Sequence, residues 1–416
     1  MARRTAIAVI AGALLVTAGC AGSPGGPDAA TGHRGEVQVV RPGALTATDV
    51  AAAQTAFGMD LLHAVCTDRP QENLALSPTS AAEALGLLYP AAGGETADRM
   101  ADLLHLPSWS PDLIAAVQQH TRALASLAAP AGTDPTADEA PDALRLSNRL
   151  WTATHTRPTP AYLDDLATAF DAGVERLDVA GDPDGATERI NAQVGRDTAG
   201  RIPEVLDRPL SPTTSAVLTN AQHLDASWLS PFASTDREAF ATPDGARDVD
   251  MMRGATGTAR TADGWVSVEL PYRDGTLAAV AVLPPAGADP CGVTSGVLDA
   301  LSDAPAAPTA VALPALHVEQ SHDLRDTLLD LGLPAHGDFA GLGSAGLEIT
   351  RVVQKTYLVV DERGTEAAAA TAVVVTESSS LSALDEVVLD RPFVLLLTDT
   401  ATRSPLFTAV IHDPSL

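Results

Sequence analysis

Glu362-Arg363-Gly364-Thr365-Glu366-Ala367-Ala368-Ala369-Ala370-Thr371 is a stretch near the C-terminus whose local signals contradict one another. Four consecutive alanines have the highest helix propensity. The valines at 373–375 are stiff at χ1 and favour a strand, whereas the flanking glycine and serines indicate a loop. One interpretation is a segment that changes conformation. The simpler alternative is an alanine-rich helix or a plain exposed loop.

If the stretch becomes a strand, one of its faces carries only small, uncharged side chains. That face consists of Thr365, Ala367, Ala369, Thr371, Val373 and Val375. Glu366, the one charged residue, falls on the opposite face with Ala368 and Ala370. Gly364 has the backbone freedom that a hinge requires. Such a ribbon could slide beneath a covering layer without steric clashes.

The stretch resembles the proximal hinge of the reactive-centre loop of serpins, a family of suicide inhibitors of proteases. Its pattern, Glu-x-Gly-Thr-Glu followed by four alanines and a threonine, is among the more specific short patterns in proteins. Further family landmarks occur in the right order, so the resemblance covers essentially all of residues 45–416. It implies an α+β serpin fold with a large central mixed β-sheet, two smaller sheets, about eight or nine helices and an exposed reactive-centre loop.

Ser77 and Ser80 belong to a pattern that resembles the strand-to-helix entry of serpins. Ser77 before Pro78 is a natural helix start, because serine caps the first turn and proline suits it. In the family these serines lie under the main sheet, in the region called the shutter. Serpins usually have histidine where this chain has Gln354, beside Lys355. Glutamine can still form bridging hydrogen bonds there, but it does not titrate.

Asn220, Trp228 and Phe232 resemble the serpin strand that ends where the loop inserts, a point called the breach. The resemblance implies that Trp228 lies beneath that point, although the same residue is also interpretable as a plain core tryptophan. Gln193 stands where serpins usually have tryptophan, in the segment that crosses the front of the sheet. This departure predicts weaker packing of that segment.

Residues 1–20 have the features of an export signal. Arg3 and Arg4 precede an apolar run that is too short to span a bilayer, and small residues then precede Cys20. This end resembles a bacterial lipoprotein processing site with Cys20 as the lipidated residue; ordinary cleavage with release is the alternative. Residues 21–43 predict a flexible tether, and 44–416 the serpin-like domain. We expect an extracellular protein, anchored to the outer face of the cell membrane or released.

The composition limits the partners of this chain. A formal net charge of −27 argues against nucleic acid, whose phosphates need basic patches. We expect a monomer that contacts the membrane only through a lipidated Cys20. The other cysteines are Cys66 and Cys291. Export permits a disulfide between them, but their spacing does not show whether they meet.

Motifs of enzymes and of metal sites are missing from the sequence. There is no Gly-x-Ser-x-Gly or His-Glu-x-x-His, and Lys355, the only lysine, has Val352 three residues before it instead of serine. His317, Glu319 and His322 come nearest to a metal-ligand set, but a strand followed by a turn would scatter them. We therefore predict no enzyme activity, no cofactor and no metal site.

The resemblance implies a serine-type endopeptidase inhibitor that forms an acyl-enzyme and then traps the protease by inserting its loop. Counting from the hinge with family spacing puts the reactive bond at Ser378–Ser379, whereas counting back from Pro392 puts it at Leu381–Ser382. Ser378 would suit an elastase-like or subtilisin-like target and Leu381 a chymotrypsin-like one; the absence of nearby lysine or arginine disfavours a trypsin-like one. The alternative is a non-inhibitory serpin that binds a ligand at the cell surface.

Overall fold

The computed structural model describes residues 32–128, 142–365 and 384–416. The predicted signal peptide with Cys20, the hinge residues from Glu366 to Thr371 and both candidate reactive bonds lie outside these ranges. None of the described helices is long and apolar enough to cross a membrane.

The central sheet has eight strands in the described part of the chain, in the order β1-β4-β3-β5-β14-β13-β11, with β12 attached to β13. Its pairings are antiparallel except that β3 runs parallel to β4 and β5 runs parallel to β13. This is the mixed sheet that was predicted. Its strands are β1 (Gly32–His33), β3 (Ala143–Ala153), β4 (Val174–Leu177), β5 (Ala216–Ser227), β11 (Leu316–Asp323), β12 (His336–Phe339), β13 (Ser344–Val360) and β14 (Gly364–Thr365).

The other described strands form one nine-stranded sheet in the order β15-β10-β7-β8-β9-β16-β17-β2, with β6 attached to β7. The two smaller sheets that were expected are therefore continuous through the long strand β7. Gly254 bulges from β7 where the register with β10 shifts; its φ is +92° and an added Cβ would lie 2.7 Å from the Cβ of Ala233. The strands are β2 (Leu74–Leu76), β6 (Ser234–Thr242), β7 (Gly245–Ala262), β8 (Trp265–Pro271), β9 (Leu277–Leu283), β10 (Ala307–Pro314), β15 (Glu386–Val388), β16 (Phe393–Asp399) and β17 (Pro405–Ile411).

Local sequence signals set the helix starts. Thr46 caps the first helix in a reciprocal arrangement with Asp49. Ser77 caps the second helix with Pro78 in its first turn, as predicted. The helices are α1 (Ala47–Asp68), α2 (Pro78–Gly86), α3 (Gly94–Leu104), α4 (Pro111–Ser126), α5 (Pro160–Phe170), α6 (Pro183–Asp197), α7 (Ser295–Asp303) and α8 (Arg325–Asp330), with short 3-10 turns η1 (Tyr89–Ala91), η2 (Pro290–Gly292) and η3 (Ala340–Leu342).

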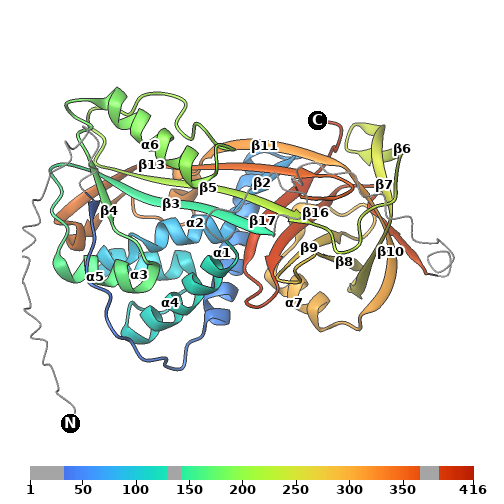
Figure 1. Ribbon diagram of the computed structural model, residues 1–416, viewed down its shortest axis with the longest axis horizontal. Coiled ribbons are helices and arrows are strands. Elements are labelled where there is room, and N and C mark those ends of the chain that lie inside the picture. Colours follow the sequence, from blue (N-terminus) through green and yellow to red (C-terminus); the bar gives the residue numbers. More distant parts are fainter. Residues whose placement is uncertain (1–31, 129–141, 366–383) are drawn as a thin grey trace, which may run out of the picture. The chain divides into compact units, whose positions relative to one another are not determined.

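Helices cover both faces of the central sheet, and strand alternation decides which side chain meets which layer. Leu218 of β5 and Val352 of β13 pack into the core formed with α1 to α5. Their neighbours Val217 and Val353 belong to a separate cluster beneath α6. Figure 1 shows α6 on one side of the strands and α1 to α5 on the other. The strands β5 and β13 are therefore buried on both faces.

The folded unit begins before the tether was predicted to end. It starts at Gly32, and β1 pairs with β4 at the edge of the central sheet. Further along, the backbone N–H groups of Glu36 and Gln38 donate to Asp164 and Thr168 of α5, each at 2.8 Å. Residues 32–38 thus contact the domain through β1 and through these two bonds, in which side chains of α5 satisfy backbone N–H groups.

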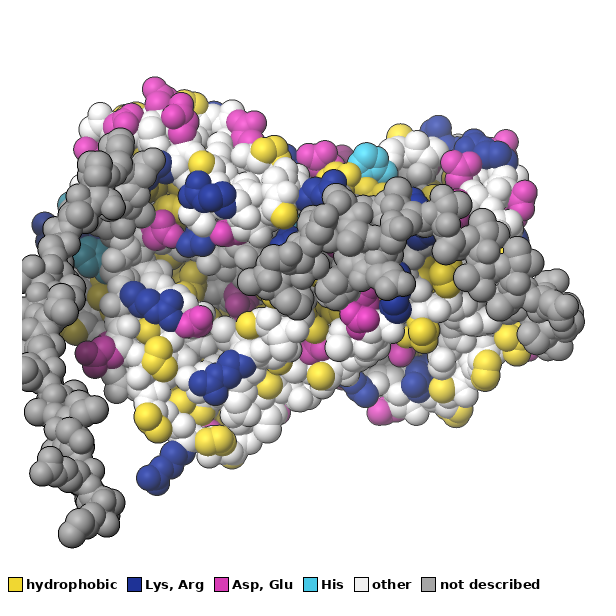
Figure 2. All heavy atoms as spheres, in the orientation of Figure 1, with side chains coloured by type: hydrophobic (Ala, Val, Ile, Leu, Met, Phe, Trp, Pro, Cys, Tyr) yellow, Lys and Arg dark blue, Asp and Glu magenta, His cyan; other side chains and the backbone are white. Residues whose placement is uncertain are grey.

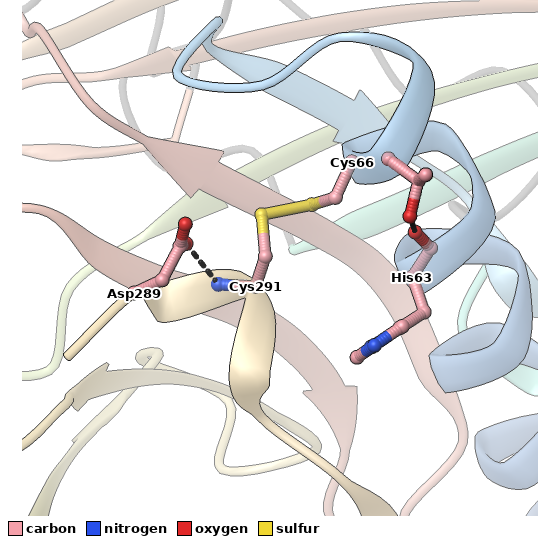
Figure 3. Close-up of a disulfide and its surroundings, with 5 residues drawn as sticks. His63, Cys66, Asp289 and Cys291 are labelled. Carbon is pink, nitrogen blue, oxygen red and sulfur yellow. Dashed lines mark hydrogen bonds between the residues drawn. A yellow bond between two sulfur atoms is a disulfide. The ribbon is translucent and has the colours of Figure 1, made fainter.

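Cys66 and Cys291 form a disulfide, which settles the question that their spacing left open. It joins the last turn of α1 to η2, with the Cα atoms 6.2 Å apart, and is shown in Figure 3. The bond closes a loop of 225 residues. By the chain-entropy argument, such a cross-link stabilises the fold by restricting the unfolded chain.

Candidate functional site at the seam between β5 and β13

The central feature of the site is the seam where β5 and β13 run side by side. Their parallel register extends from Ile349 opposite Ala216 to Thr356 opposite Gln222. Further along β5, at Ala226, the partner strand has changed to β14. The two central strands are thus paired at one end of the seam and separated by another strand at the other end.

A tight reversal after Val360 brings the chain back into the sheet as β14. The carboxylate of Asp361 accepts hydrogen bonds from the backbone N–H groups of Arg363 and Gly364, at 2.8 and 3.0 Å. The N–H of Asp361 in turn donates to the carbonyl oxygen of Gly364 at 2.9 Å. An aspartate that holds its own turn in this way fixes the direction in which the following strand leaves.

Gly364 and Thr365 already lie between the two central strands, so the hinge does not begin outside the sheet. Thr365 pairs antiparallel with Val360 on one side and with Ala226 on the other, and its side chain is buried. A Cβ on Gly364 would lie 2.0 Å from the carbonyl oxygen of Ala226, so only glycine fits there. The described part of the hinge is thus already a strand of the central sheet.

Trp228 lies beneath the hinge, as the resemblance implied. Its indole N–H donates to the carbonyl oxygen of Asp361 at 2.9 Å, and its backbone N–H donates to that of Arg363 at 2.8 Å. The indole stacks on Tyr272 with ring centroids 4.5 Å apart. The Tyr272 hydroxyl hydrogen-bonds to the hydroxyl of Thr365. The stacked rings of Trp228 and Tyr272 thus lie beneath Thr365 and the turn that precedes it.

Glu362 points away from the sheet and is anchored separately. Its carboxylate accepts a hydrogen bond from the hydroxyl of Thr235 on β6, and its carbonyl oxygen accepts one from the N–H of Phe232 at 2.9 Å. The turn is therefore fixed on both sides before the chain enters the segment that the structure does not describe.

The shutter residues meet under the seam. The Gln354 amide on β13 donates to Asn220 on β5 at 3.1 Å and to the carbonyl oxygen of Ser77 at 2.9 Å. Its oxygen accepts from the N–H of Ser77 at 3.0 Å, and the Ser77 hydroxyl contacts Gln222. One glutamine thus links both central strands to the start of α2 (the bridging role expected of it). All four side chains are almost fully buried, so each bond is made away from water.

Ser80 and Lys355, also singled out from the sequence, lie on opposite faces of the sheet. The Ser80 hydroxyl donates to Asn148 of β3 at 2.5 Å, beneath the sheet. Lys355 follows Gln354 and therefore points to the α6 face, where its ammonium lies 3.2 Å from the carboxylate of Glu319. Lys355 is thus not part of the buried shutter network.

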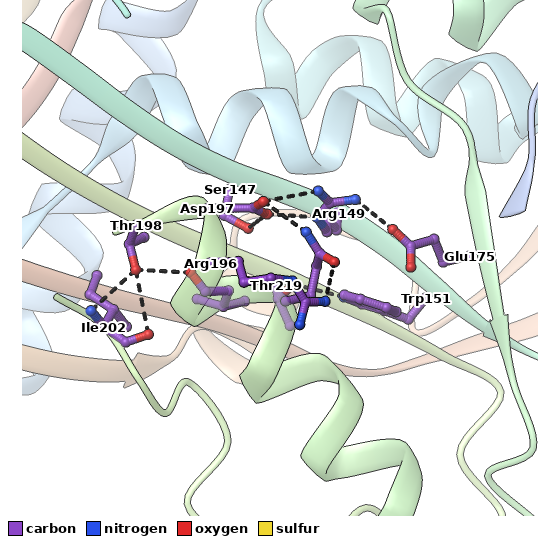
Figure 4. A network of polar contacts seen from close by, with 11 residues as sticks. Ser147, Arg149, Trp151, Glu175, Arg196, Asp197, Thr198, Ile202 and Thr219 are labelled. Carbon is purple, nitrogen blue, oxygen red and sulfur yellow. Dashed lines mark hydrogen bonds and ion pairs between the residues drawn. The ribbon is translucent and has the colours of Figure 1, made fainter. Parts of the chain in front are cut away.

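The Gln193 side chain takes part in a polar network at the end of α6; the weaker packing expected there stays a prediction. The Gln193 amide donates to Asp197 at 2.8 Å, at the end of α6. Asp197 also accepts from the hydroxyl of Ser147 at 2.7 Å and from Arg149 at 2.8 Å, both on β3 (Figure 4). Arg149 continues to Glu175 on β4. Charge-assisted bonds therefore fasten α6 to the sheet.

His317, Glu319 and His322 were expected to be scattered by a turn, but no turn separates them. All three lie on the single strand β11, where His317 and Glu319 are exposed and His322 is buried on the other face. His322 lies opposite Gln354 in the register of β11 and β13. Its ring lies 3.1 Å from the Gln320 side-chain oxygen and 3.3 Å from the Arg69 guanidinium.

Burial, and next the charge of Arg69, lower the pKa of His322 from 6.5 to about 4. The unfolded chain therefore binds more protons than the folded chain between those values, so stability falls as the pH drops from 6.5 towards 4. We expect this group to remove at most about 3 kcal/mol over that range. In urea unfolding at pH 7 and pH 4.5, His322→Gln should lose less stability than the parent. Equal losses in both proteins would contradict the prediction.

Several positive side chains of the described residues form ion pairs with acidic neighbours. On the face shown in Figure 2 they lie among acidic side chains and do not form a continuous stripe. Arg253, for example, contacts Glu238 and Glu386, each at 2.6 Å.

Comparison with known proteins identifies the class to which this fold and hinge belong. The family model described as serpin (serine protease inhibitor) matches residues 52–414. The chain therefore belongs to the serpin family. An uncharacterized serpin-like protein of Thermococcus kodakarensis is 32% identical, over 88% of this chain and 86% of its own length.

Other relatives and solved structures also belong to serpins or share their fold. The leukocyte elastase inhibitor of Bos taurus is 28% identical over 88% of this chain and 99% of its own length. The crystal structure of tengpin, a thermophilic serpin in the native state, superposes with a TM-score of 0.77 at 23% identity, over 91% of this chain and 97% of tengpin. Thyroxine-binding globulin in complex with thyroxine superposes with a TM-score of 0.72 at 23% identity, over 88% and 99%. The serpin fold is thus confirmed.

Several residues of the site were not found by sequence reasoning. Tyr272, Gln222 and Asp197 act through partners that are distant in sequence, and nothing beside them indicates those partners. Asp361 had a usable signal, because aspartate three residues before Gly364 is typical of a side-chain-held turn. Sequence reasoning also did not indicate that Asp289 and His412 lie beside Cys291.

Proposed function

We propose that the protein inhibits a serine protease by completing the insertion that β14 has begun. The observation that carries this proposal is the placement of Gly364 and Thr365 between two strands that are parallel to each other. A strand that enters there runs antiparallel to both neighbours. One parallel ladder is then replaced by two antiparallel ladders, which are the more stable pairing.

If the register of β14 continued, each residue after Thr365 would lie between a particular residue of β5 and one of β13. Because Thr365 lies opposite Ala226 and Val360, Thr371 would come between Asn220 and Gln354, whose mutual hydrogen bond it would replace. Val373 would come between Leu218 and Val352, in the core under the sheet. The small-residue face predicted from the sequence is thus the face that would point into the core.

In the proposed mechanism, the protease serine attacks the reactive bond and forms an ester to the loop, and the new amino terminus departs. The cut loop then inserts. About 13 residues at roughly 3.3 Å each carry the attached protease about 40 Å. Its triad and oxyanion hole tolerate little distortion, so hydrolysis of the ester stops. The uncut fold must therefore be metastable. The proposed bonds remain Ser378–Ser379, or alternatively Leu381–Ser382.

The experiment that tests this function is incubation of the protein with elastase, subtilisin, chymotrypsin and trypsin. We expect one of the first three to give a covalent complex that survives boiling in detergent, with loss of protease activity. Mass spectrometry of the released C-terminal peptide would then choose between the two bonds. Cleavage by all four proteases without any complex would refute the proposal.

A non-inhibitory binding function is the second candidate, because thyroxine-binding globulin shares the fold. Two residues of the hinge favour inhibition. Gly364 and Thr365 are small enough to lie inside the sheet, and the small side chains that follow them continue that pattern.

We further propose that the mature protein is anchored to the outside of the cell membrane by a lipid on Cys20. The support is the export-signal pattern that ends at this cysteine. Two acyl chains would suffice for stable anchoring. When cells that express Cys20→Ser are fractionated, the protein should be found in the medium instead of the membrane fraction. An unchanged distribution would rule out lipidation at Cys20.

A further inference from the structure

Four side chains from three separate segments gather at the disulfide. Cys66 belongs to α1, Asp289 and Cys291 to η2 and its cap, and His412 follows β17. The candidate ligand atoms of Asp289, Cys291 and His412 all lie within 4.8 Å of one another, and Cys66 is bonded to Cys291. Figure 3 shows the bridge between α1 and the loop, with Asp289 beside Cys291.

His412 is the unexplained member of this group. It is 3% exposed, and neither of its ring nitrogens has a hydrogen-bond partner among the described residues. A buried polar group in this condition calls for an explanation, and a bound ion is one. Its position is well fixed, because the Asn73 side-chain oxygen accepts from the backbone N–H groups of His412 and Asp413, at 2.8 and 2.9 Å.

We propose that Cys66, Cys291, His412 and Asp289 bind one zinc ion when the two cysteines are reduced. The disulfide is then the oxidised state of a redox-controlled metal site. Two thiolates, an imidazole and a carboxylate match the ligands and the number that tetrahedral zinc prefers. Zinc bonds of about 2.0–2.3 Å place neighbouring ligand atoms roughly 3.3–3.8 Å apart. The ligand atoms of Asp289, Cys291 and His412 therefore need only a small contraction. The sulfur atoms of Cys66 and Cys291 must move apart once their bond is broken, and Cys66 completes the set from the neighbouring α1.

The cap of η2 prepares the carboxylate for this role. Asp289 Oδ1 accepts a hydrogen bond from the N–H of Cys291 at 2.9 Å. This bond orients the carboxylate and presents Oδ2 as the oxygen for a metal, in the way that neighbouring hydrogen bonds orient metal ligands.

Zinc binding requires that the disulfide is first reduced. A phosphine reductant breaks the sulfur–sulfur bond and is oxidised to its oxide, taking the oxygen of one water molecule. The two protons of that water complete the two thiols. Zinc then displaces both thiol protons and binds two thiolates, so its affinity rises with pH and depends on the reductant.

The test uses the full chain with Cys20→Ser, so that Cys66 and Cys291 are its only cysteines. The protein is reduced with the phosphine under nitrogen and titrated with Co²⁺, which reports thiolate and tetrahedral ligation by its absorption bands. We expect one Co²⁺ per chain with thiolate charge-transfer bands, displaced by one Zn²⁺. Zn²⁺ should also protect both thiols from alkylation. The oxidised protein should show none of these bands.

Variants assign the ligands. His412→Phe should weaken Co²⁺ binding at least about 100-fold, more than the loss of an outer partner costs. Asp289→Asn retains the oxygen that caps η2 and should weaken binding about tenfold. Exposed His63, one helical turn before Cys66, provides the control His63→Ala, which should bind as the parent does. Absence of the thiolate bands after reduction, or parent-like binding by folded His412→Phe, would overturn the proposal. An equal loss of Co²⁺ affinity in His412→Phe and His63→Ala would also overturn it.

Discussion

Thr365→Arg is expected to convert the protein from an inhibitor into a substrate of its target protease. The Thr365 side chain is 1% exposed and hydrogen-bonds to Tyr272 inside the sheet. Because Thr365 already lies between the two central strands, arginine there would place an unpaired charge inside the sheet at a cost of several kcal/mol. The hinge would therefore leave the sheet, and the strand could no longer grow from it. Each 1.4 kcal/mol is a factor of ten, so the yield of covalent complex should fall at least about tenfold while cleavage of the loop continues. Gel quantification of complex against cleaved chain measures both.

Two variants serve as controls for this result. Glu366→Arg places the same side chain one residue further along, where strand alternation directs it to the outer face. Thr365→Ser retains the hydroxyl that meets Tyr272. Both should form complex at close to the parental yield. A Thr365→Arg protein that forms complex as well as these two would contradict the insertion mechanism.

Cutting the loop between residues 376 and 382 is expected to raise the melting temperature by at least about 10 °C. The ordering of the loop and its new ladder hydrogen bonds largely offset each other. The net gain in stability therefore comes from burying apolar side chains of the loop. Val373 and Val375 together contribute about 5 kcal/mol to it. In a domain of this size each kcal/mol shifts the melting temperature by about 2 °C. Calorimetry of intact and cut protein measures the change.

The matched control is the same cut in the Thr365→Arg protein, in which the freed strand cannot enter the sheet. That sample should melt no higher than its uncut form. If the cut parent also showed no increase, the uncut fold would not be metastable, and the inhibitory mechanism would be lost although family membership would stand.

The sequence predicted those parts of the site that depend on local signals. Ser77, with Pro78 in the first turn, indicates its helix start by a side-chain cap. The small face of the ribbon after Gly364 stays a prediction. These features depend on residues a few positions apart, so one chain is enough to recognise them.

The parts that the sequence did not predict depend on tertiary contacts. Nothing next to Tyr272 indicates that its hydroxyl meets Thr365, 93 positions further along. The loss of tryptophan at Gln193 predicted weaker packing, yet Asp197 gathers Gln193 and two side chains of β3 into a polar clamp. His412 has no histidine or cysteine nearby in the sequence, so its place beside the disulfide became visible only in the fold.

The position of Lys355 has a practical consequence. It is the only lysine in the chain, and it lies opposite Ala221 across the seam, where the extended register would bring Ala370 alongside it. An amine-reactive dye would therefore label one side chain of the unmodified protein, besides any free N-terminal amine, at the point where the proposed mechanism opens the sheet. Its fluorescence could time that opening in single-turnover experiments without any engineered label site.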